Sequence, residues 1–153
     1  MKVYVDADAC PVVSIVIRLS RARGVPVVLL CDTNHILSDD YAEVRTIDAG
    51  RDAVDIALFN LARPGDIVIT QDYGVAATVL GKGCHALHQS GMRYTNDNID
   101  SLLMQRHLAR EARMARRRNH LHGPAKRTPE DDLHFEQALR ALFAEVGSKG
   151  TQA

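Results

Sequence analysis

The sequence predicts an α/β protein of three layers, in which helices cover both faces of a parallel β-sheet and a helical extension follows at the C-terminal end. The chain has 153 residues, of which 46% are hydrophobic and 25% are charged, as in one ordinary globular domain. Up to residue 100, short apolar runs alternate with segments of helical periodicity, which is typical of a parallel sheet. We therefore expect a single domain over residues 1–147 and a frayed tail over residues 148–153.

The N-terminal third predicts three strands and the first helix. The β-branched run Val3–Val5 is followed by a turn and by a helical segment that has Pro11 in its first turn. The continuous apolar run Val25–Cys31 is typical of a strand buried on both faces. Residues 38–41 then favour a turn of helix, and Val44–Ile47 favours a third strand.

The middle of the chain predicts the rest of the sheet. Apolar residues recur at helical spacing over Arg51–Ala62, before a Pro-Gly pair ends the helix. Asp66–Thr70 is a second buried strand of the continuous apolar kind. A short helix over Val75–Leu80 and a strand over Cys84–Leu87 complete the alternation, so we expect five parallel strands.

The C-terminal third predicts two long helices. Thr95 is a suitable N-cap for a helix that starts near Ile99 and continues through an arginine-rich stretch to about Asn119. Thr128 precedes a proline and two acids, the pattern of a cap and a first helical turn. The last helix is expected to run through Val146.

Cysteine usage and hydropathy indicate the compartment. The three cysteines lie far apart without a C-x-x-C pair, and this odd number favours free thiols in a reducing environment. A strand-like run follows Met1 directly, where a signal peptide would have a basic region and an apolar region. Since no stretch approaches the roughly 18 apolar residues of a membrane helix, we expect a cytoplasmic protein.

Several aspartates fall where strands are predicted to end. Asp6 and Asp8 follow the first strand, Asp72 follows the Asp66–Thr70 strand, and Asp52 and Asp55 lie one turn apart on the helix before it. Ligands of open parallel sheets bind beyond the carboxyl ends of the strands, so these acids are expected at one edge. Two carboxylates about 4 Å apart repel by roughly 4 kcal/mol at an effective dielectric near 20, and a hard divalent cation such as Mg²⁺ or Mn²⁺ offsets that repulsion.

A purely structural interpretation stays open for each acid. Aspartates after strands commonly cap the next helix or form turns. Thr70 precedes Asp72 by two residues and is suited either to orient a water or phosphate or simply to pack at a strand end. We assign to turns and caps the remaining aspartates of this group: Asp32, Asp39, Asp40, Asp48 and Asp66.

Five motifs carry a resemblance to a known family. They are V-Y-V-D-A-D-A-C-P from Val3, D-A-G-R-D-A-V-D-I-A-L from Asp48, I-V-I-T-Q-D-Y-G from Ile67, T-N-D-N-I from Thr95 and H-G-P from His122. Together they span nearly the whole chain, which resembles the YaiI/YqxD family of bacterial proteins. That family in turn resembles the PIN-like group of metal-dependent nucleases.

The resemblance implies a PIN-like, Rossmannoid fold and a metal-dependent nuclease. Its pattern has an acid at the end of the first strand, a helix acid, and a strand that closes in Thr-x-Asp. Carried over to this chain, the pattern makes Asp6, Asp55 and Asp72 the metal-site acids. Asp8 and Asp52 become nearby support, and Thr70 takes the threonine position.

A basic segment predicts contact with nucleic acid. Residues 101–128 contain one acid and eight bases, although the whole chain has formal net charge zero. A helical stripe of arginines can neutralise phosphates of RNA or another nucleic acid, with release of counterions. Its expected members are Arg106, Arg110, Arg113, Arg117 and Arg118. Alternatively, the stripe is a solvated helix face or pairs with the acidic last helix, without a role in binding.

Two other functions remain open from the residues alone. Asp6 and Asp8 also fit the D-x-D start of haloacid-dehalogenase-type phosphatases, which need a later lysine, and only Lys82 is conceivable in that role. The other alternative is a non-catalytic nucleic-acid-binding module with structural acids. Tyr73 and Tyr94 are the candidate stacking platforms near the predicted edge.

Overall fold

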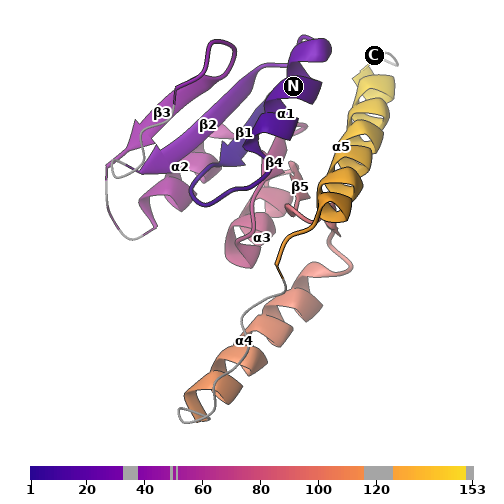
Figure 1. Ribbon diagram of the computed structural model, residues 1–153. Helices are drawn as coiled ribbons and strands as arrows, with labels where there is room; N and C mark the ends of the chain where they lie inside the picture. The colour runs from indigo at the N-terminus through magenta and orange to yellow at the C-terminus, as the bar shows by residue number, and fades with distance from the viewer. Residues whose placement is uncertain (33–37, 49, 51, 116–125, 151–153) are drawn as a thin grey trace.

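The computed structural model describes residues 1–32, 38–48, 50, 52–115 and 126–150, the last three by their backbone alone. The elements in chain order are β1 (Val3–Asp6), α1 (Val13–Ala22), β2 (Val27–Asp32), β3 (Glu43–Ile47), α2 (Ala53–Leu61), β4 (Ile67–Ile69), α3 (Tyr73–Gly81), β5 (His85–Leu87), β6 (Arg93–Tyr94), α4 (Ile99–Ala115) and α5 (Pro129–Gly150). Figure 1 shows this arrangement.

The strands form one sheet in the order β3-β2-β1-β4-β5-β6. The first five are parallel, and β6 pairs with β5 in the antiparallel direction. Val5 of β1 lies between Leu29 of β2 and Ile69 of β4, so the first strand is the centre of the sheet. Each of β1, β2 and β4 has a neighbouring strand on either side and is buried on both faces of the sheet, as the continuous apolar runs predicted for β2 and β4.

Helices cover both faces of the sheet and form the predicted three-layer α/β architecture. Residues of α1 and α5 pack on one face around Val5 and Leu29. Residues of α2, α3 and the start of α4 pack on the other face around Val28 and Val68. Beyond this start, residues 104–115 of α4 are exposed, and the helix projects away from the sheet (Figure 1).

The last two helices begin at the predicted caps. The Thr95 hydroxyl accepts from the Asn98 N–H (3.2 Å), and the Asn98 side chain accepts from the Thr95 N–H in return (2.8 Å). Asp131 accepts from the backbone N–H of Thr128 (2.8 Å), as in a capping box. No helix among the described residues is long and apolar enough to cross a membrane.

Three local expectations need correction. The predicted helical turn at 38–41 is wrong, because Asp39 accepts the N–H groups of Tyr41 and Ala42 and holds a bend. The two-residue strand β6 was missed, since so short an element has no periodicity to detect. Finally, α5 continues past Val146 to Gly150, and no proline stands in that stretch to end it.

Candidate functional site

The site lies between β1 and β4, where the order of the strands in the sheet reverses. From β1 the chain passes through α1 to β2, and from β4 it passes through α3 to β5 on the opposite face. Between two neighbouring strands whose connections leave in opposite directions, the carboxyl edge stays open as a crevice. Asp6 is the last residue of β1, and Thr70 and Asp72 directly follow β4. Both strand ends therefore deliver their polar residues to this crevice, as predicted.

Thr70 links the two aspartates. Its side chain is buried, with 2% of the residue exposed, and its hydroxyl lies 3.5 Å from Oδ2 of Asp6. The same hydroxyl accepts from the backbone N–H of Asp72 at 3.1 Å. Because the hydroxyl carries a single proton, that proton is directed to Asp6. Thr70 therefore connects the Asp6 carboxylate at the end of β1 to the backbone of Asp72 after β4.

Asp72 has two functions at once. Its Oδ1 atom accepts from the backbone N–H groups of Gly74 (2.8 Å) and Val75 (3.3 Å), so it caps α3. The same oxygen lies 3.3 Å from Nη1 of Arg106, which comes from α4. The structural interpretation of Asp72 as a cap is thus correct, and it leaves Oδ2 outside these three contacts.

The acids of this edge repel one another. Burial raises the pKa of Asp6 to about 6, and the charges of Asp55, Asp8 and Asp72 contribute to the rise. Burial and the charges of Asp72 and Asp52 likewise raise the pKa of Asp55 above its ordinary value, while Arg106 opposes this shift. Each of the five predicted acids therefore lies close enough to at least one of the others for their charges to repel.

Two clefts divide these acids between them. The first, of about 730 Å³, is lined by Asp6, Asp8, Gln71, Asp72, Tyr73, His88, Gln105, Arg106 and Ala109. The second, of about 460 Å³, contains Asp52, Asp55 and the apolar side chains Ile56 and Phe59. Asp72 and Arg106 line both clefts, so their ion pair forms the boundary between the two.

The supporting acids differ in their surroundings. The Asp8 carboxylate accepts from the backbone N–H of Asp32 at 3.1 Å, which fixes it beside the end of β2. Asp52 is exposed and has a left-handed backbone, with φ of 65°. Its side chain makes no capping hydrogen bond to α2. The simple capping interpretation therefore does not explain Asp52.

The donor chemistry of this edge fits a hard cation. Within the described part of the chain, no three Asp, Glu, His or Cys side chains form a ready group around one metal position. The nearby donors are carboxylates, which Mg²⁺ and Mn²⁺ prefer, and Mg²⁺ commonly keeps several waters beside one or two protein carboxylates. Asp6 and Asp72 are the two that Thr70 holds together.

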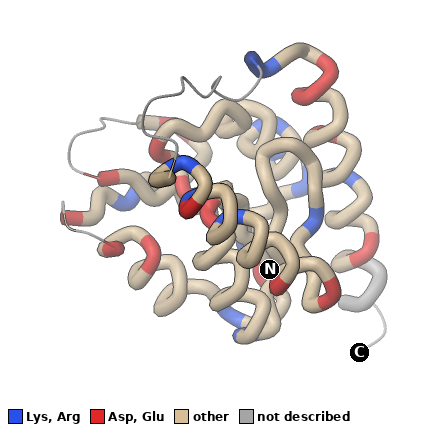
Figure 2. Tube along the Cα trace, turned by 90° about the horizontal axis from the view of Figure 1, so that it is seen from below, with Lys and Arg blue, Asp and Glu red and all other residues tan. Residues whose placement is uncertain are grey.

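The basic stripe is exposed on α4. Arg106, Arg110 and Arg113 all lie on the part of this helix that projects from the sheet, and the charged residues can be followed along the Cα trace in Figure 2. Arg106 reaches back to Asp72 and thereby joins the stripe to the acidic edge. Arg117 and Arg118 lie outside the described residues.

Comparison with known families identifies one family that matches most of the chain. The family described as "Uncharacterized BCR, YaiI/YqxD family" matches residues 4–145. The chain belongs to the YaiI/YqxD family. The match spans every strand and the whole acidic edge, from Tyr4 in β1 to Glu145 in α5. The resemblance inferred from the five motifs is therefore confirmed.

Several bacterial relatives are similar to this chain over most of its length. The UPF0178 protein CA_C2825 of Clostridium acetobutylicum is 62% identical over 143 residues, which cover 94% of this chain and 97% of the relative. UPF0178 proteins of Alkaliphilus oremlandii and Exiguobacterium sibiricum are 51% and 49% identical, over 91% and 95% of this chain and 88% and 98% of their own lengths. No solved structure matches the chain significantly.

The structure adds polar residues of this YaiI/YqxD chain that the sequence analysis did not select. Gln71, His88 and Gln105 line the Asp6 cleft. His88 follows β5, so the strand-end rule that selected the aspartates applies to it as well. The position of Gln105 in the cleft depends on where α4 packs, and no local sequence pattern predicts that packing. Tyr94 cannot be an open stacking platform, because only 1% of it is exposed.

Other candidates of the chain lie away from this edge. Lys82 stands at the C-cap of α3, directly before β5, and its ammonium lies 4.9 Å from the centre of the Phe59 ring. It is therefore at the opposite sheet edge from Asp6, which disfavours the phosphatase alternative. Asp66 accepts from the backbone N–H groups of Lys2 and Arg63 and is structural, as expected.

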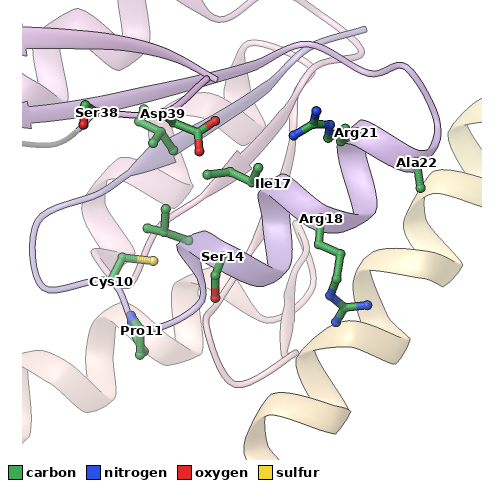
Figure 3. Close-up of a pocket in the computed structure, with 11 residues that line it drawn as sticks. Cys10, Pro11, Ser14, Ile17, Arg18, Arg21, Ala22, Ser38 and Asp39 are labelled. Carbon is green, nitrogen blue, oxygen red and sulfur yellow. The ribbon is translucent and has the colours of Figure 1, made fainter. Parts of the chain in front are cut away.

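A further cleft of about 820 Å³ lies beside α1 (Figure 3). It is larger than the acidic clefts, but its charged groups are engaged in contacts of the fold. Arg21 pairs with Asp40, and Asp39 accepts the backbone N–H groups of Tyr41 and Ala42. Arg18 is turned toward α5, where it pairs with Glu136. Burial raises the pKa of Cys10, so its thiol stays protonated and is a poor nucleophile. We therefore place the chemistry at the Asp6 edge.

Proposed function

We propose that this protein is a divalent-metal-dependent nuclease that hydrolyses phosphodiester bonds of RNA. One observation carries the proposal. Two acids that are far apart in the sequence, Asp6 and Asp72, meet at the crevice between β1 and β4, where a buried threonine links them. A capping role alone requires no such meeting of two strand ends.

The chain's own residues supply the metal position and its alignment. When bound there, Mg²⁺ or Mn²⁺ would offset the charge of a phosphodiester and lower the pKa of an attacking water. Asp6 and Asp72 hold the ion, with Asp55 and Asp8 as the neighbouring charges that make a cation favourable. Thr70 fixes the Asp6 carboxylate by its hydroxyl proton.

The arginines of α4 bind the polymer in this proposal. Arg110 and Arg113 are exposed, so each can contact a phosphate at the surface of α4. Arg106 lines both clefts, so its guanidinium can contact a phosphate that binds beside the acids in either one. The three free cysteines suit the reducing cytoplasm, where we place this activity.

A cleavage assay tests the proposal. Purified protein is incubated with labelled single-stranded RNA in millimolar Mn²⁺, with EDTA as the metal-free arm. The wild type should cleave, and Asp6→Asn and Asp72→Asn should each lose cleavage by at least a hundredfold while they still bind RNA. Binding should survive because the α4 arginines remain and because one negative charge near the polymer is gone.

The matched control is Asp40→Asn, which removes an exposed acid on the far side, where Asp40 pairs with Arg21. This variant should cleave as the wild type does. Undiminished cleavage by a folded Asp72→Asn protein would contradict the mechanism. RNA binding without metal-dependent cleavage by the wild type would support the binding-module alternative instead.

A further inference from the structure

Three aromatic rings form one wall of the Asp6 cleft. Tyr73 and His88 line the cleft, and Tyr94 lies buried behind them. The ring centres are 5.8 Å apart for Tyr73 and Tyr94, 6.1 Å for His88 and Tyr94, and 6.5 Å for Tyr73 and His88. All three pairs meet edge to face, which is a favourable arrangement for aromatic rings. The buried ring therefore braces the two half-buried ones.

This wall is tied to the acidic edge by hydrogen bonds. The Tyr94 hydroxyl donates to the backbone carbonyl of Thr70 (3.2 Å), the residue that aligns Asp6 and Asp72. Tyr73 directly follows Asp72 in the chain. A flat ligand on these rings would therefore lie at a fixed distance from the two carboxylates.

His88 offers a hydrogen-bond donor rather than a charge. Its Nδ1 atom accepts from the backbone N–H of Ser90 (3.0 Å), so the proton of the neutral ring is on Nε2. Burial and the nearby charge of Arg127 lower the pKa of His88 and favour this neutral form. The aromatic wall thus has no net charge, in contrast to the carboxylates that line the same cleft.

Two amide side chains complete the uncharged part of the cleft. Gln71 comes from the segment between β4 and α3, and Gln105 comes from α4. Each amide has both donor and acceptor groups, as the edge of a nucleobase does. Aromatic faces combined with donors and acceptors of this kind are how proteins bind unpaired bases.

We infer that Tyr73, His88, Gln71 and Gln105 form a nucleobase-binding subsite beside the carboxylates, so the substrate is an unpaired, single-stranded nucleotide. The inference rests on the proposed function for the position of the phosphate at Asp6 and Asp72. It adds that the base adjoining this phosphate leaves its stack and lies against Tyr73 and His88. A base inside a duplex has no free face for such a contact.

The experiment compares two ligands that share their phosphate and ribose. Binding of adenosine 5′-monophosphate and of ribose 5-phosphate to the full chain is measured by calorimetry in millimolar Mn²⁺. Neither compound contains a phosphodiester, so the result does not depend on cleavage. The wild type should bind the nucleotide on the order of tenfold more tightly, because base–aromatic stacking contributes that much.

The variants assign this preference to the rings. Tyr73→Leu and His88→Leu should each reduce the ratio of the two affinities toward one, whereas Tyr73→Phe should retain it. Tyr41→Leu is the matched control, since Tyr41 is also half-buried but packs with the core on the α1 face. Two separate ring variants keep the test informative if one of them fails to fold.

Equal affinity for the two ligands, no binding of either one, or a ratio unchanged in both folded ring variants would overturn the subsite. The outcomes also separate the two proposals. A base preference in a protein that cleaves no RNA would overturn the nuclease and keep the subsite. Metal-dependent cleavage without a base preference would overturn the subsite and keep the nuclease.

Discussion

At the scale of single residues, Asp6 bears the main electrostatic cost of this edge. Its pKa of about 6 lies above the ordinary value of 3.8, because burial and the charges of Asp55, Asp8 and Asp72 disfavour its ionised form. The unfolded chain ionises this carboxyl near pH 4 and the folded chain near pH 6. Stability therefore falls as the pH rises between these values, and the loss is complete at neutral pH.

Replacing Asp6 by asparagine should consequently stabilise the metal-free protein. A pKa shift of one unit corresponds to about 1.4 kcal/mol. We therefore expect Asp6→Asn to raise the free energy of unfolding by up to roughly 3 kcal/mol at pH 7.5. Near pH 4 the gain should disappear, since the native carboxyl is then protonated. Urea unfolding at both pH values, in EDTA, provides the measurement.

The control is Asp40→Asn, because Asp40 is an exposed acid of the opposite side. Its effect should be small and nearly the same at both pH values. If Asp6→Asn were destabilising at pH 7.5, or if its effect did not depend on pH, the carboxylates would not repel one another as we describe.

At the scale of elements, α4 connects the acidic edge to the exposed arginines that we propose bind the polymer. Its first turns pack against α3, and its remaining turns project with Arg110 and Arg113 exposed. The projecting part also exposes large apolar side chains to water, among them Met104 and Leu108. This part of α4 therefore exposes apolar side chains beside its arginines.

Neutralising Arg110 and Arg113 should weaken RNA binding and reduce its dependence on salt. In Arg110→Gln/Arg113→Gln, two phosphate contacts and their released counterions disappear. For single-stranded RNA, the slope of log affinity against log salt should fall by about 1.4, at roughly 0.7 per contact. Fluorescence anisotropy over a series of KCl concentrations measures both quantities.

The same net charge is removed from the other side of the molecule in Arg21→Gln/Arg23→Gln, which alters α1 and its C-cap. That variant should bind RNA with a nearly unchanged slope. Equal losses in both variants would indicate a general charge effect and would remove the special role of α4.

The elements were largely predictable, because their signals are local. Continuous apolar runs predicted the buried strands, and the caps at Thr95 and Thr128 predicted the starts of the last two helices. The aspartates of the edge followed from the rule that parallel strands deliver their carboxyl ends to one side. The division of Asp6 and Asp55 between two clefts was not predictable, since it depends on where Arg106 of α4 docks.

At the scale of the whole molecule, a bound cation should stabilise the folded state. A ligand that binds only the native protein, at ~100 times its dissociation constant, adds about 2.7 kcal/mol. For a chain of this size, this corresponds to a rise in melting temperature of roughly 5–10 °C. We expect such a rise for the wild type in millimolar Mn²⁺, measured by differential scanning calorimetry.

The double variant Asp6→Asn/Asp72→Asn should show no comparable rise. Asp40→Asn/Glu43→Gln, which removes two exposed acids at the amino end of β3, should respond as the wild type does. A shift of equal size in all three proteins would mean that Mn²⁺ binds elsewhere, and the assigned metal position would then be wrong.

The link between Asp6 and Thr70 also determines when the edge comes into existence during synthesis. The two residues are 64 positions apart, and their contact requires β4 to pair with β1. At about 5–20 residues per second, a ribosome needs roughly 3–13 s to add the chain between them. During this interval β1 and β2 can already pair, while Asp6 ends a strand with an open flank. A nascent chain is therefore without this edge until nearly half of its 153 residues have been translated, and any activity there can begin only after that point.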